Sequence, residues 1–478
     1  MFETVDPIHL AVVLIVGAAS LGSGVHALLN KSDSRSALIW IATCLAWPLI
    51  GPMVYWVFGR NRIQTKGRKL QERFPQEPVG VRELQLDPKP PPELPSNSAK
   101  LIRISENVTG RPLLSGNRVK PLHCAEEAYP EMLAAIRSAQ KSVRMMSYIF
   151  DNDRTGAEFC EALREATQRG VDVKVILDGV GEHHSLRRMS VVLRRAGVNV
   201  ERFLPPSLIP PALHINLRNH RKILVVDGAL GFTGGMNISD RHYVQTPRRK
   251  RPVVDLHFKV QGPIVQQMEE VFLEDWGFVT GEETEAPTPA PPDTSGATFC
   301  RAISDGPNED IDKLKWILLG AISSAQTSIR IMTPYFIPSE ELTSALNAAS
   351  LRGVRVEILL PSVLDIRPVG WAARNHLLSL LPFGVHISRA PAPFIHTKLL
   401  IIDEHYMLVG SANLDPRSLR LNFEFNLELY DEDCALSLTQ HFDSTLALST
   451  PITQEELENR SLPIRIRDSI AFLFSPYL

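Results

Sequence analysis

The 478-residue sequence lacks the features of several common classes of protein. Its five cysteines are scattered, with no Cys-x-x-Cys pair, which argues against a disulfide scaffold and a structural zinc site. Neither charge dominates, because 51 Lys and Arg residues are balanced by 53 Asp and Glu residues, so bulk positive charge for binding nucleic acid is missing. With 22% charged and 44% hydrophobic residues, the chain is neither disordered nor a coiled coil. Its length allows a few domains of about 150 residues.

Charged side chains are also missing from two stretches near the N-terminus, residues 7–30 and 36–59. Each is long enough for a helix to cross a hydrocarbon core about 30 Å thick. We therefore expect residues 1–62 to form a membrane anchor with two transmembrane helices, a hairpin. Two alternatives stay open for the first stretch: a cleaved signal peptide, although a basic leading region is missing, and a re-entrant or interfacial helix.

Basic residues flank the second stretch unevenly. Six lie between residues 60 and 73, two lie in the loop between the stretches, and none lies in the N-terminal tail. Because basic flanking residues stay on the cytoplasmic side of a membrane, we expect the rest of the chain to be cytoplasmic. The same cluster can attract anionic lipid headgroups.

Two proline-rich segments divide the remaining chain. The first, residues 63–100, begins with basic residues, and the second covers residues 281–295; both are predicted to be extended tethers. They delimit two parts of similar size, residues 101–280 and 296–478, which we interpret as two domains.

These two parts are an internal repeat. Residues 135–144 match residues 321–330, and each predicts a helix end followed by an apolar strand. Residues 169–177 match residues 352–360, where a glycine suited to a helix C-cap precedes a β-branched run. Helices that alternate with strands predict an α/β sheet in each half, and hence a duplicated α/β domain.

A polar motif occurs once in each half. A single His-x-Lys sequence usually belongs to a surface strand. In any strand the histidine and the lysine of this sequence point to the same face. Here five positions recur in the second half with identical spacing, which indicates a functional site. These positions are His220, Lys222, Asp227, Gly234 and Asn237 in the first copy, and His396, Lys398, Asp403, Gly410 and Asn413 in the second.

With these motifs, residues 101–478 resemble the phospholipase D superfamily, whose signature is His-x-Lys-x4-Asp followed by Gly-Gly/Ser-x-Asn. Residues 46–62 and 410–424 are similar to segments of bacterial cardiolipin synthases. The resemblance implies two phospholipase D-type α/β-sandwich domains with pseudo-two-fold symmetry, and an enzyme of the bacterial inner membrane. It also implies conversion of two phosphatidylglycerol molecules to cardiolipin and glycerol through a phosphatidyl-histidine intermediate.

The residue types suit phosphodiester chemistry. One histidine can attack phosphorus while the other transfers protons, because the ordinary pKa of histidine is about 6.5. Lys222 and Lys398 would bind the non-bridging oxygens, and Asn237 and Asn413 would add hydrogen-bond donors. The resemblance implies that His220 is the nucleophile, but the two copies are chemically alike and leave this order open.

Four carboxylates belong to the predicted site. Asp227 and Asp403 are grouped with the catalytic residues, although each lies at the far end of its strand, where a structural role such as pairing across the repeat interface is favoured. Asp255 and Glu424 are lone acids that enter apolar strands. They are the supporting residues expected to orient the histidines, the alternative being strand-end charges. No carboxylate cluster suited to a divalent ion accompanies the motif, so no metal or other cofactor is expected.

Other functions stay open. A membrane-bound phospholipase D or transphosphatidylase would use another alcohol or water as the acceptor. A nuclease is disfavoured because no aromatic stacking platform accompanies the basic residues, and a non-catalytic scaffold because neither motif is broken. The expected partners are therefore phosphatidylglycerol, other anionic phospholipids and the membrane, without nucleic acid.

Two further segments have open interpretations. The basic run at residues 248–251 is either a solvated loop or a contact with an anionic membrane surface. Residues 464–474 mix basic and large apolar side chains, which fits either a helix on the bilayer or core packing.

Overall fold

The computed structural model describes residues 7–31, 34–59, 94–95, 98–185, 187–208, 211–212, 217–282, 295–306 and 312–475. Most of the two predicted tethers, and the basic residues between positions 60 and 73, lie outside these ranges. The chain divides into an N-terminal unit, residues 1–73, and a second unit, residues 74–478, and each is described by itself.

The N-terminal unit contains one helix that could span a membrane. Helix α1 (Pro7–Asn30) is followed by α2 (Ser34–Ala46), the short α3 (Ile50–Val54) and the π-helical turn η1 (Tyr55–Gly59). In the described part of the chain, only residues 8–30 are long and apolar enough to cross a bilayer.

The predicted transmembrane hairpin is therefore wrong. The second apolar stretch is not one continuous helix, because it breaks at residues 47–49. Pro48 explains the break, since its nitrogen has no hydrogen to donate and its ring disfavours a helical residue before it.

The broken stretch packs back on α1. The Ser20 hydroxyl donates to the carbonyl of Cys44 near the end of α2. Tyr55 returns toward the C-terminal end of α1, where its hydroxyl lies 2.7 Å from His26 Nδ1. Trp56 Nε1 donates to Ser23 Oγ over 3.0 Å. Residues 34–59 thus run along α1 in α2 and then turn back in α3 and η1.

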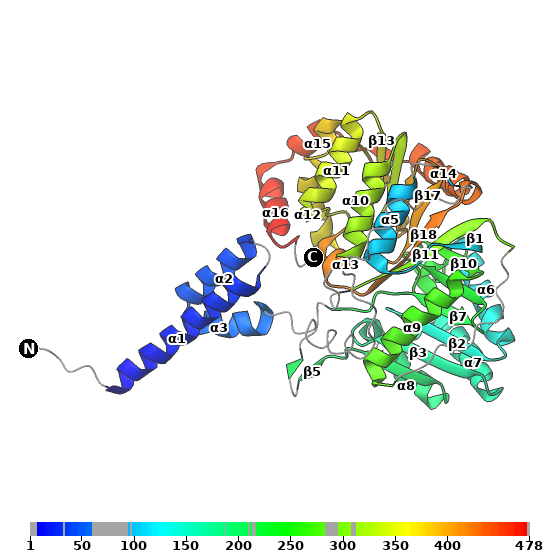
Figure 1. Cartoon of the computed structure of the whole chain (residues 1–478), viewed down its shortest axis with the longest axis horizontal. Helices are drawn as coiled ribbons and strands as arrows, with labels where there is room; N and C mark the ends of the chain where they lie inside the picture. The colour runs from blue at the N-terminus through cyan, green and yellow to red at the C-terminus, as the bar shows by residue number, and fades with distance from the viewer. Residues whose placement is uncertain are drawn as a thin grey trace, which may run out of the picture. The chain divides into compact units, whose positions relative to one another are not determined.

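The second unit is built from two α/β halves (Figure 1). The main strands of the first half are β1 (Leu114–His123), β2 (Ser142–Ser147), β3 (Asp172–Asp178), β4 (Asn199–Phe203), β7 (Ile223–Val226), β8 (Leu230–Gly234) and β10 (Leu256–Gln261). Those of the second half are β11 (Thr298–Asp305), β12 (Ser328–Met332), β13 (Arg355–Pro361), β14 (His386–Ala390), β16 (Leu399–Ile402), β17 (Tyr406–Gly410), β18 (Glu424–Tyr430) and β19 (Thr450–Pro451).

These strands join in one fifteen-stranded mixed sheet, with the order β19-β14-β13-β12-β16-β17-β18-β11-β1-β10-β8-β7-β2-β3-β4. Apart from β19, equivalent strands follow in the same order on the two sides of the β11–β1 junction, which gives the unit its pseudo-two-fold symmetry. The predicted duplicated α/β fold is confirmed, but the two expected sheets are continuous because β1 pairs antiparallel with β11.

The chain that carries the motifs lies in the buried middle of each half. Strand β7 lies between β2 and β8, and β16 lies between β12 and β17. All four residues of β7 and of β16 are buried, which explains their continuous apolar sequences. The two predicted C-cap glycines, Gly170 and Gly353, have the positive φ angles of +85° and +92° that this position favours.

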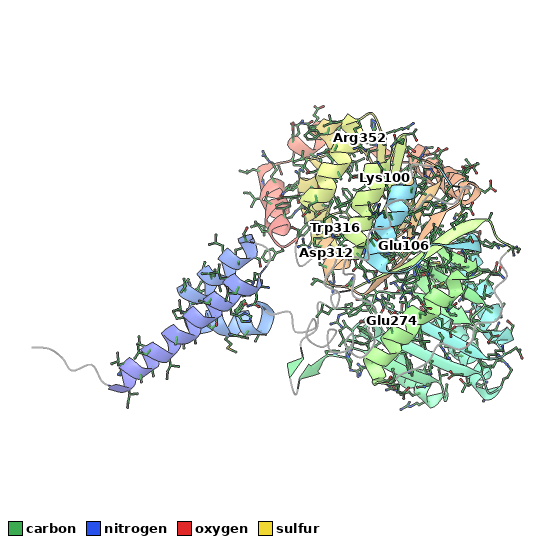
Figure 2. The ribbon with its side chains drawn as sticks, in the orientation of Figure 1. Lys100, Glu106, Glu274, Asp312, Trp316 and Arg352 are labelled. Atoms are coloured by element: carbon green, nitrogen blue, oxygen red, sulfur yellow. The ribbon has the colours of Figure 1, made fainter. Side chains whose placement is uncertain are left out.

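Helices cover the sheet on both sides of the junction. In the first half these include α6 (Cys124–Ser138), α7 (Arg154–Gln168), α8 (Met189–Arg195) and α9 (Ile264–Thr280), and in the second half α10 (Lys313–Ser324), α11 (Glu340–Leu351), α12 (Arg367–Leu377) and α14 (Glu432–Ala447). Helix α5 (Ser98–Thr109) lies beside α10, with Lys100, Glu106 and Trp316 marked in Figure 2. Leu101 and Ile102 of α5 belong to the core of the second half, although α5 precedes the first.

The C-terminal helix α16 (Leu462–Leu473) packs on α12. Its buried Asp468 carboxylate accepts hydrogen bonds from Arg374 and Arg460, while Ile466 and Ile470 remain exposed. One face of the helix thus packs on the second unit, in line with the core-packing interpretation, and the position of the exposed face on a bilayer stays a prediction.

Candidate active site

Each motif histidine lies just before a strand and is held by backbone of the other half. His220 and Lys222 precede β7, and the His220 amide donates to the carbonyl of Phe423 over 2.8 Å. His396 and Lys398 precede β16. The short strand β15 (Phe394–Ile395) before His396 pairs in parallel with β9 (Val253–Val254), and the His396 amide donates to the carbonyl of Val254 over 2.8 Å.

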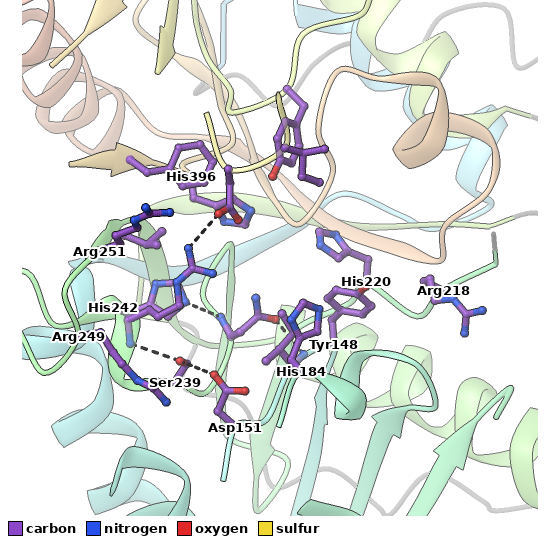
Figure 3. Close-up of a pocket in the computed structure, with 18 of the residues that line it drawn as sticks. Tyr148, Asp151, His184, Arg218, His220, Ser239, His242, Arg249, Arg251 and His396 are labelled. Atoms are coloured by element: carbon purple, nitrogen blue, oxygen red, sulfur yellow. Dashed lines mark hydrogen bonds and ion pairs between the residues drawn. The ribbon is translucent and has the colours of Figure 1, made fainter. Parts of the chain in front are cut away.

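Because each motif histidine is held by backbone of the other half, both motifs lie at one cavity of about 910 Å³ (Figure 3). Of the predicted site residues, His220, His396, Asn237 and Asn413 line it. The two motifs, which lie far apart in the sequence, are thus joined by the fold at a single site.

The predicted acids bind the histidines crosswise, which means that the acid of each half contacts the motif histidine of the other half. His220 of the first half lies 3.0 Å, Nδ1 to Oε2, from Glu424 of the second half. His396 of the second half lies 2.7 Å, Nδ1 to Oδ2, from Asp255 of the first half. Both acids are buried, 0% and 1% exposed. Because each acid engages Nδ1, Nε2 is the ring nitrogen left for a substrate.

The two acids have different surroundings. Glu424 also accepts from the Ser411 hydroxyl at 2.5 Å and from Asn422 Nδ2 at 3.1 Å. Burial acts to raise the pKa of Glu424, but His220, Lys222 and Ser411 outweigh it and the pKa is lowered. Burial raises the pKa of Asp255, although Lys398 opposes this.

The residue after the first motif glycine differs between the two motifs, and in each half it suits the size of the neighbouring acid. Gly235 and Ser411 occupy equivalent positions, each directly after the first motif glycine. A methyl group on Gly235 would overlap the Asp255 carboxylate, so the shorter acid fills that space. In the second half the hydroxyl of Ser411 instead donates to the longer Glu424.

The motif lysines are buried beside their histidines. Lys222 Nζ donates to the carbonyl of His220 over 2.7 Å. Lys398 Nζ donates to the carbonyl of His396 and also lies 2.8 Å from the Nδ1 atom of the His396 ring. Burial lowers the pKa of Lys222 to about 7 and the pKa of Lys398 to about 8. The flexible stem allows each Nζ to exchange its carbonyl for a phosphate oxygen.

Burial also lowers the pKa of both motif histidines. For His220, Glu424 opposes this shift, while Lys222 adds to it. For His396, the neighbouring Lys398 and His220 add to the effect of burial, and the pKa is well below its ordinary value. Both rings are therefore neutral at neutral pH, which is the state that a nucleophile needs.

The two asparagines differ in their hydrogen bonds. Asn237 Oδ1 accepts from the amide of Ile149 at 3.2 Å. Asn413 Nδ2 donates to Ser418 Oγ at 3.2 Å, and its buried Oδ1 has no hydrogen-bond partner among the described residues.

The motif aspartates lie away from the cavity. The Asp227 carboxylate accepts from the backbone amides of residues 140–142, over 2.7 to 2.9 Å, where α6 leads into β2. Asp403 accepts in the same way from residues 326–328. Each therefore ties a helix–strand junction within its own half, not across the repeat interface. Although burial acts to raise the pKa of Asp403, the backbone donors lower it.

Some cavity residues were missed by sequence reasoning. Tyr148 follows β2 and its ring contacts His220 at a centroid distance of 5.1 Å, and Tyr335 follows β12 near His396 at 6.4 Å. A tyrosine after the matched strand of each half was a usable signal. His242, which has no repeat partner, also lines the cavity; its Nε2 accepts from the Asn237 amide, and burial lowers its pKa to about 3.

His214, which precedes the first motif by six residues and was considered for the cavity mouth on that ground alone, lies outside the described residues. The residues that the structure describes contain no group of three or more His, Cys, Asp or Glu side chains that could hold a metal ion.

A pair of neutral histidines, each fixed by a buried acid and accompanied by a buried lysine, is an arrangement suited to phosphoryl transfer. The family described as "Cardiolipin synthase, PLD-like domain" matches residues 132–276 and 318–446, more than half of the chain. The chain belongs to the cardiolipin synthase family of the phospholipase D superfamily, which confirms the resemblance seen in the sequence.

Relatives match over nearly the whole length. "Cardiolipin synthase" of Geobacillus sp. (strain WCH70) is 32% identical over 461 residues, covering 95% of this chain and 91% of the relative. "Cardiolipin synthase 2" of Staphylococcus epidermidis is 30% identical over 462 residues, 94% of each. Among solved structures, phosphatidylserine synthase of Haemophilus influenzae is similar in fold, with a TM-score of 0.61 and 16% identity over 79% of this chain and 100% of that one.

The buried lysines predict a loss of activity at alkaline pH. As pH rises through about 7 to 8, Lys222 and Lys398 lose their protons in the free enzyme, so kcat/KM should fall. A bound phosphate favours the charged amines, so kcat should persist to higher pH than kcat/KM. Steady-state kinetics between about pH 6 and about 9.5 test this, and a kcat/KM that stays constant to the upper limit would contradict it.

Proposed function

We propose that this chain is a phosphatidyltransferase that makes cardiolipin and glycerol from two phosphatidylglycerol molecules. The observation that carries the proposal is the crosswise pairing of His220 with Glu424 and of His396 with Asp255 at one cavity. Two oriented histidines at one site can act on opposite sides of a single phosphorus atom, which a double displacement requires.

In the first half-reaction, His220 Nε2 attacks the phosphorus of the donor lipid. A P–N bond forms while the bond from phosphorus to the glycerol oxygen breaks, and protonated His396 gives its proton to that oxygen. The anionic phosphate raises the share of protonated His396, whose charge Asp255 stabilises. Glycerol leaves, and the phosphatidyl group remains on His220.

In the second half-reaction, neutral His396 takes the proton from the terminal hydroxyl of a second phosphatidylglycerol. That oxygen attacks phosphorus, the P–N bond breaks, and cardiolipin forms with His220 restored. Lys222, Lys398 and the two asparagines are proposed to hold the non-bridging oxygens. The crosswise hydrogen bonds keep Nδ1 of both rings occupied, so that only Nε2 reacts.

Helix α1 supports anchoring in the bacterial cell membrane. Lys31, Arg35 and the six basic residues at positions 60–73 all follow α1 in the sequence. Basic residues next to a span favour the cytoplasmic side, so we place the catalytic unit there.

Product analysis of the purified full-length protein with phosphatidylglycerol tests the function. We expect cardiolipin and glycerol in equal amounts. Phosphatidic acid would instead indicate a phospholipase D, another phosphatidyl alcohol a transphosphatidylase, and no turnover a non-catalytic scaffold. With a membrane-impermeant short-chain lipid, sealed inverted vesicles should form product and right-side-out vesicles should not.

A further inference from the structure

The two halves differ in the length of the segment between the motif asparagine and the histidine-orienting acid. The segment from Asn237 to Asp255 in the first half is clearly longer than the segment from Asn413 to Glu424 in the second. The longer segment contains the basic run at residues 248–251, Arg-Arg-Lys-Arg. The repeat therefore preserves the catalytic groups, while the first half carries a run of four basic residues that the second half lacks.

Of this run, Arg248 is structural and the other three residues reach the cavity. The Arg248 guanidinium stacks 3.7 Å from the centre of the Tyr243 ring and donates to Thr155. Arg249, Lys250 and Arg251 line the cavity and are exposed. We call these three residues the basic rim.

The fold places the basic rim on the His396 side. The rim leads through Pro252 into β9, whose Val254 carbonyl holds the His396 amide. Figure 3 shows Arg249 and Arg251 on the same side of the cavity as His396, with His220 and Arg218 on the opposite side.

On the opposite side, Arg218 is paired with an acid. Arg218 lies 3.7 Å from Asp178, and both are buried. Arg417 lies in the short helix α13 (Pro416–Arg420), whose N-cap Asp415 also lines the cavity. On the rim, Arg249 is 3.7 Å from Asp153, but Lys250 and Arg251 have no acidic side chain within ion-pair distance in the described part of the chain.

We propose that the basic rim is a subsite for the phosphodiester of the acceptor lipid, an inference that rests on the proposed function. His220 occupies one side of phosphorus in the intermediate, so the second alcohol must enter from the His396 side, where glycerol left. The glycerol group of the acceptor separates its reacting hydroxyl from its own phosphate by three carbons. Arginine and lysine beside His396 are suited to bind that anion.

The rim thereby selects the acceptor. The departing glycerol is neutral and water carries no phosphate, so neither gains from the rim, whereas a second phosphatidylglycerol does. This favours transfer over hydrolysis and over the return of glycerol.

The test compares acceptors in the full-length protein. The variant Lys250→Gln/Arg251→Gln removes two rim charges, and Lys100→Gln/Arg195→Gln removes two charges outside the cavity lining. Each is assayed in non-ionic detergent micelles that contain phosphatidylglycerol as the acceptor and a radiolabelled donor lipid whose aryl-phosphate headgroup leaves readily. The measurements are the rate of adduct formation and the partition of the adduct among cardiolipin, phosphatidic acid and the product of added ethanol.

We expect the rim variant to form cardiolipin ~10-fold less efficiently from the adduct, the loss typical of a charge-assisted contact. Its adduct formation and its transfer to water and ethanol should stay within about twofold of the wild type, as all rates should in the control. Cardiolipin formation equal to the control would overturn the subsite. So would an equal fall of all products together with weaker sedimentation on anionic vesicles, which would assign the rim to membrane attraction. Absence of cardiolipin from the wild type would instead refute the proposed function.

Discussion

His220→Ala is expected to form no covalent adduct with phosphatidyl donors, whereas His396→Ala should still form one when the leaving group is activated. The adduct requires Nε2 of His220, which the Glu424 contact at Nδ1 leaves available. An aryl-phosphate headgroup departs without a proton, so the general acid becomes dispensable for the first half-reaction. With phosphatidylglycerol itself, both variants should lose ~10²-fold or more of their turnover.

The experiment mixes each variant with a lipid that is labelled at phosphorus and carries a nitrophenyl headgroup. Release of nitrophenol is followed, and the quenched protein is digested to find the labelled peptide. His386→Ala, an exposed histidine at the start of β14, is the control for the loss of a ring and should behave as the wild type. Label on the peptide containing His396 would reverse the roles. Normal product without any label would show direct transfer.

The second large effect separates the two kinds of aspartate. Asp227→Asn should lower the free energy of unfolding by about 1.5–3 kcal/mol, because its carboxylate accepts three backbone amides and an amide NH₂ would face donors. Asp255→Asn should fold as well as the wild type, because burial already raises the pKa of Asp255 and makes its charge costly.

Turnover should show the opposite pattern. Asp255→Asn loses the acceptor that orients His396 and stabilises its protonated form, so kcat should fall ~10²-fold. Asp227→Asn, measured below its melting temperature, should keep most of its kcat because its carboxylate lies away from the cavity. Thermal unfolding and kcat in one detergent decide this, and equal melting temperatures for the two variants would refute the assignment.

The duplicated fold could be predicted because short stretches of sequence determine its strands and helix ends. The apolar runs that became β7 and β16 and the glycines at positions 170 and 353 follow from backbone preferences alone. The acids Asp255 and Glu424 could be recognised as lone charges entering buried strands. Which histidine each would meet could not be predicted, because that depends on how the halves join, and the spacing between the two acids departs from the constant spacing of the motifs.

The anchor shows the limit of counting apolar residues. The length and composition of residues 36–59 fit a second span. In the structure the chain reverses after Ala46, and Tyr55 and Trp56 bind His26 and Ser23 of α1. Pro48 breaks the helix, and the side-chain contacts hold the returning chain on α1. A mean hydropathy over a window of residues registers neither effect.

The crosswise exchange of acids has a consequence for the ancestry of the protein. A contact in which each half orients the other's histidine has the form of an isologous interface, the kind found between identical subunits related by a two-fold axis. In a half-length chain of this design, the acid would not contact the histidine of the same chain, so the site would be complete only in a homodimer. In this protein both halves lie in one chain, so their sequences can differ. The first half combines Gly235 with an aspartate and contains the basic run, whereas the second combines Ser411 with a glutamate. With the proposed subsite, a nearly symmetric site therefore treats the donor and the acceptor phosphatidylglycerol differently.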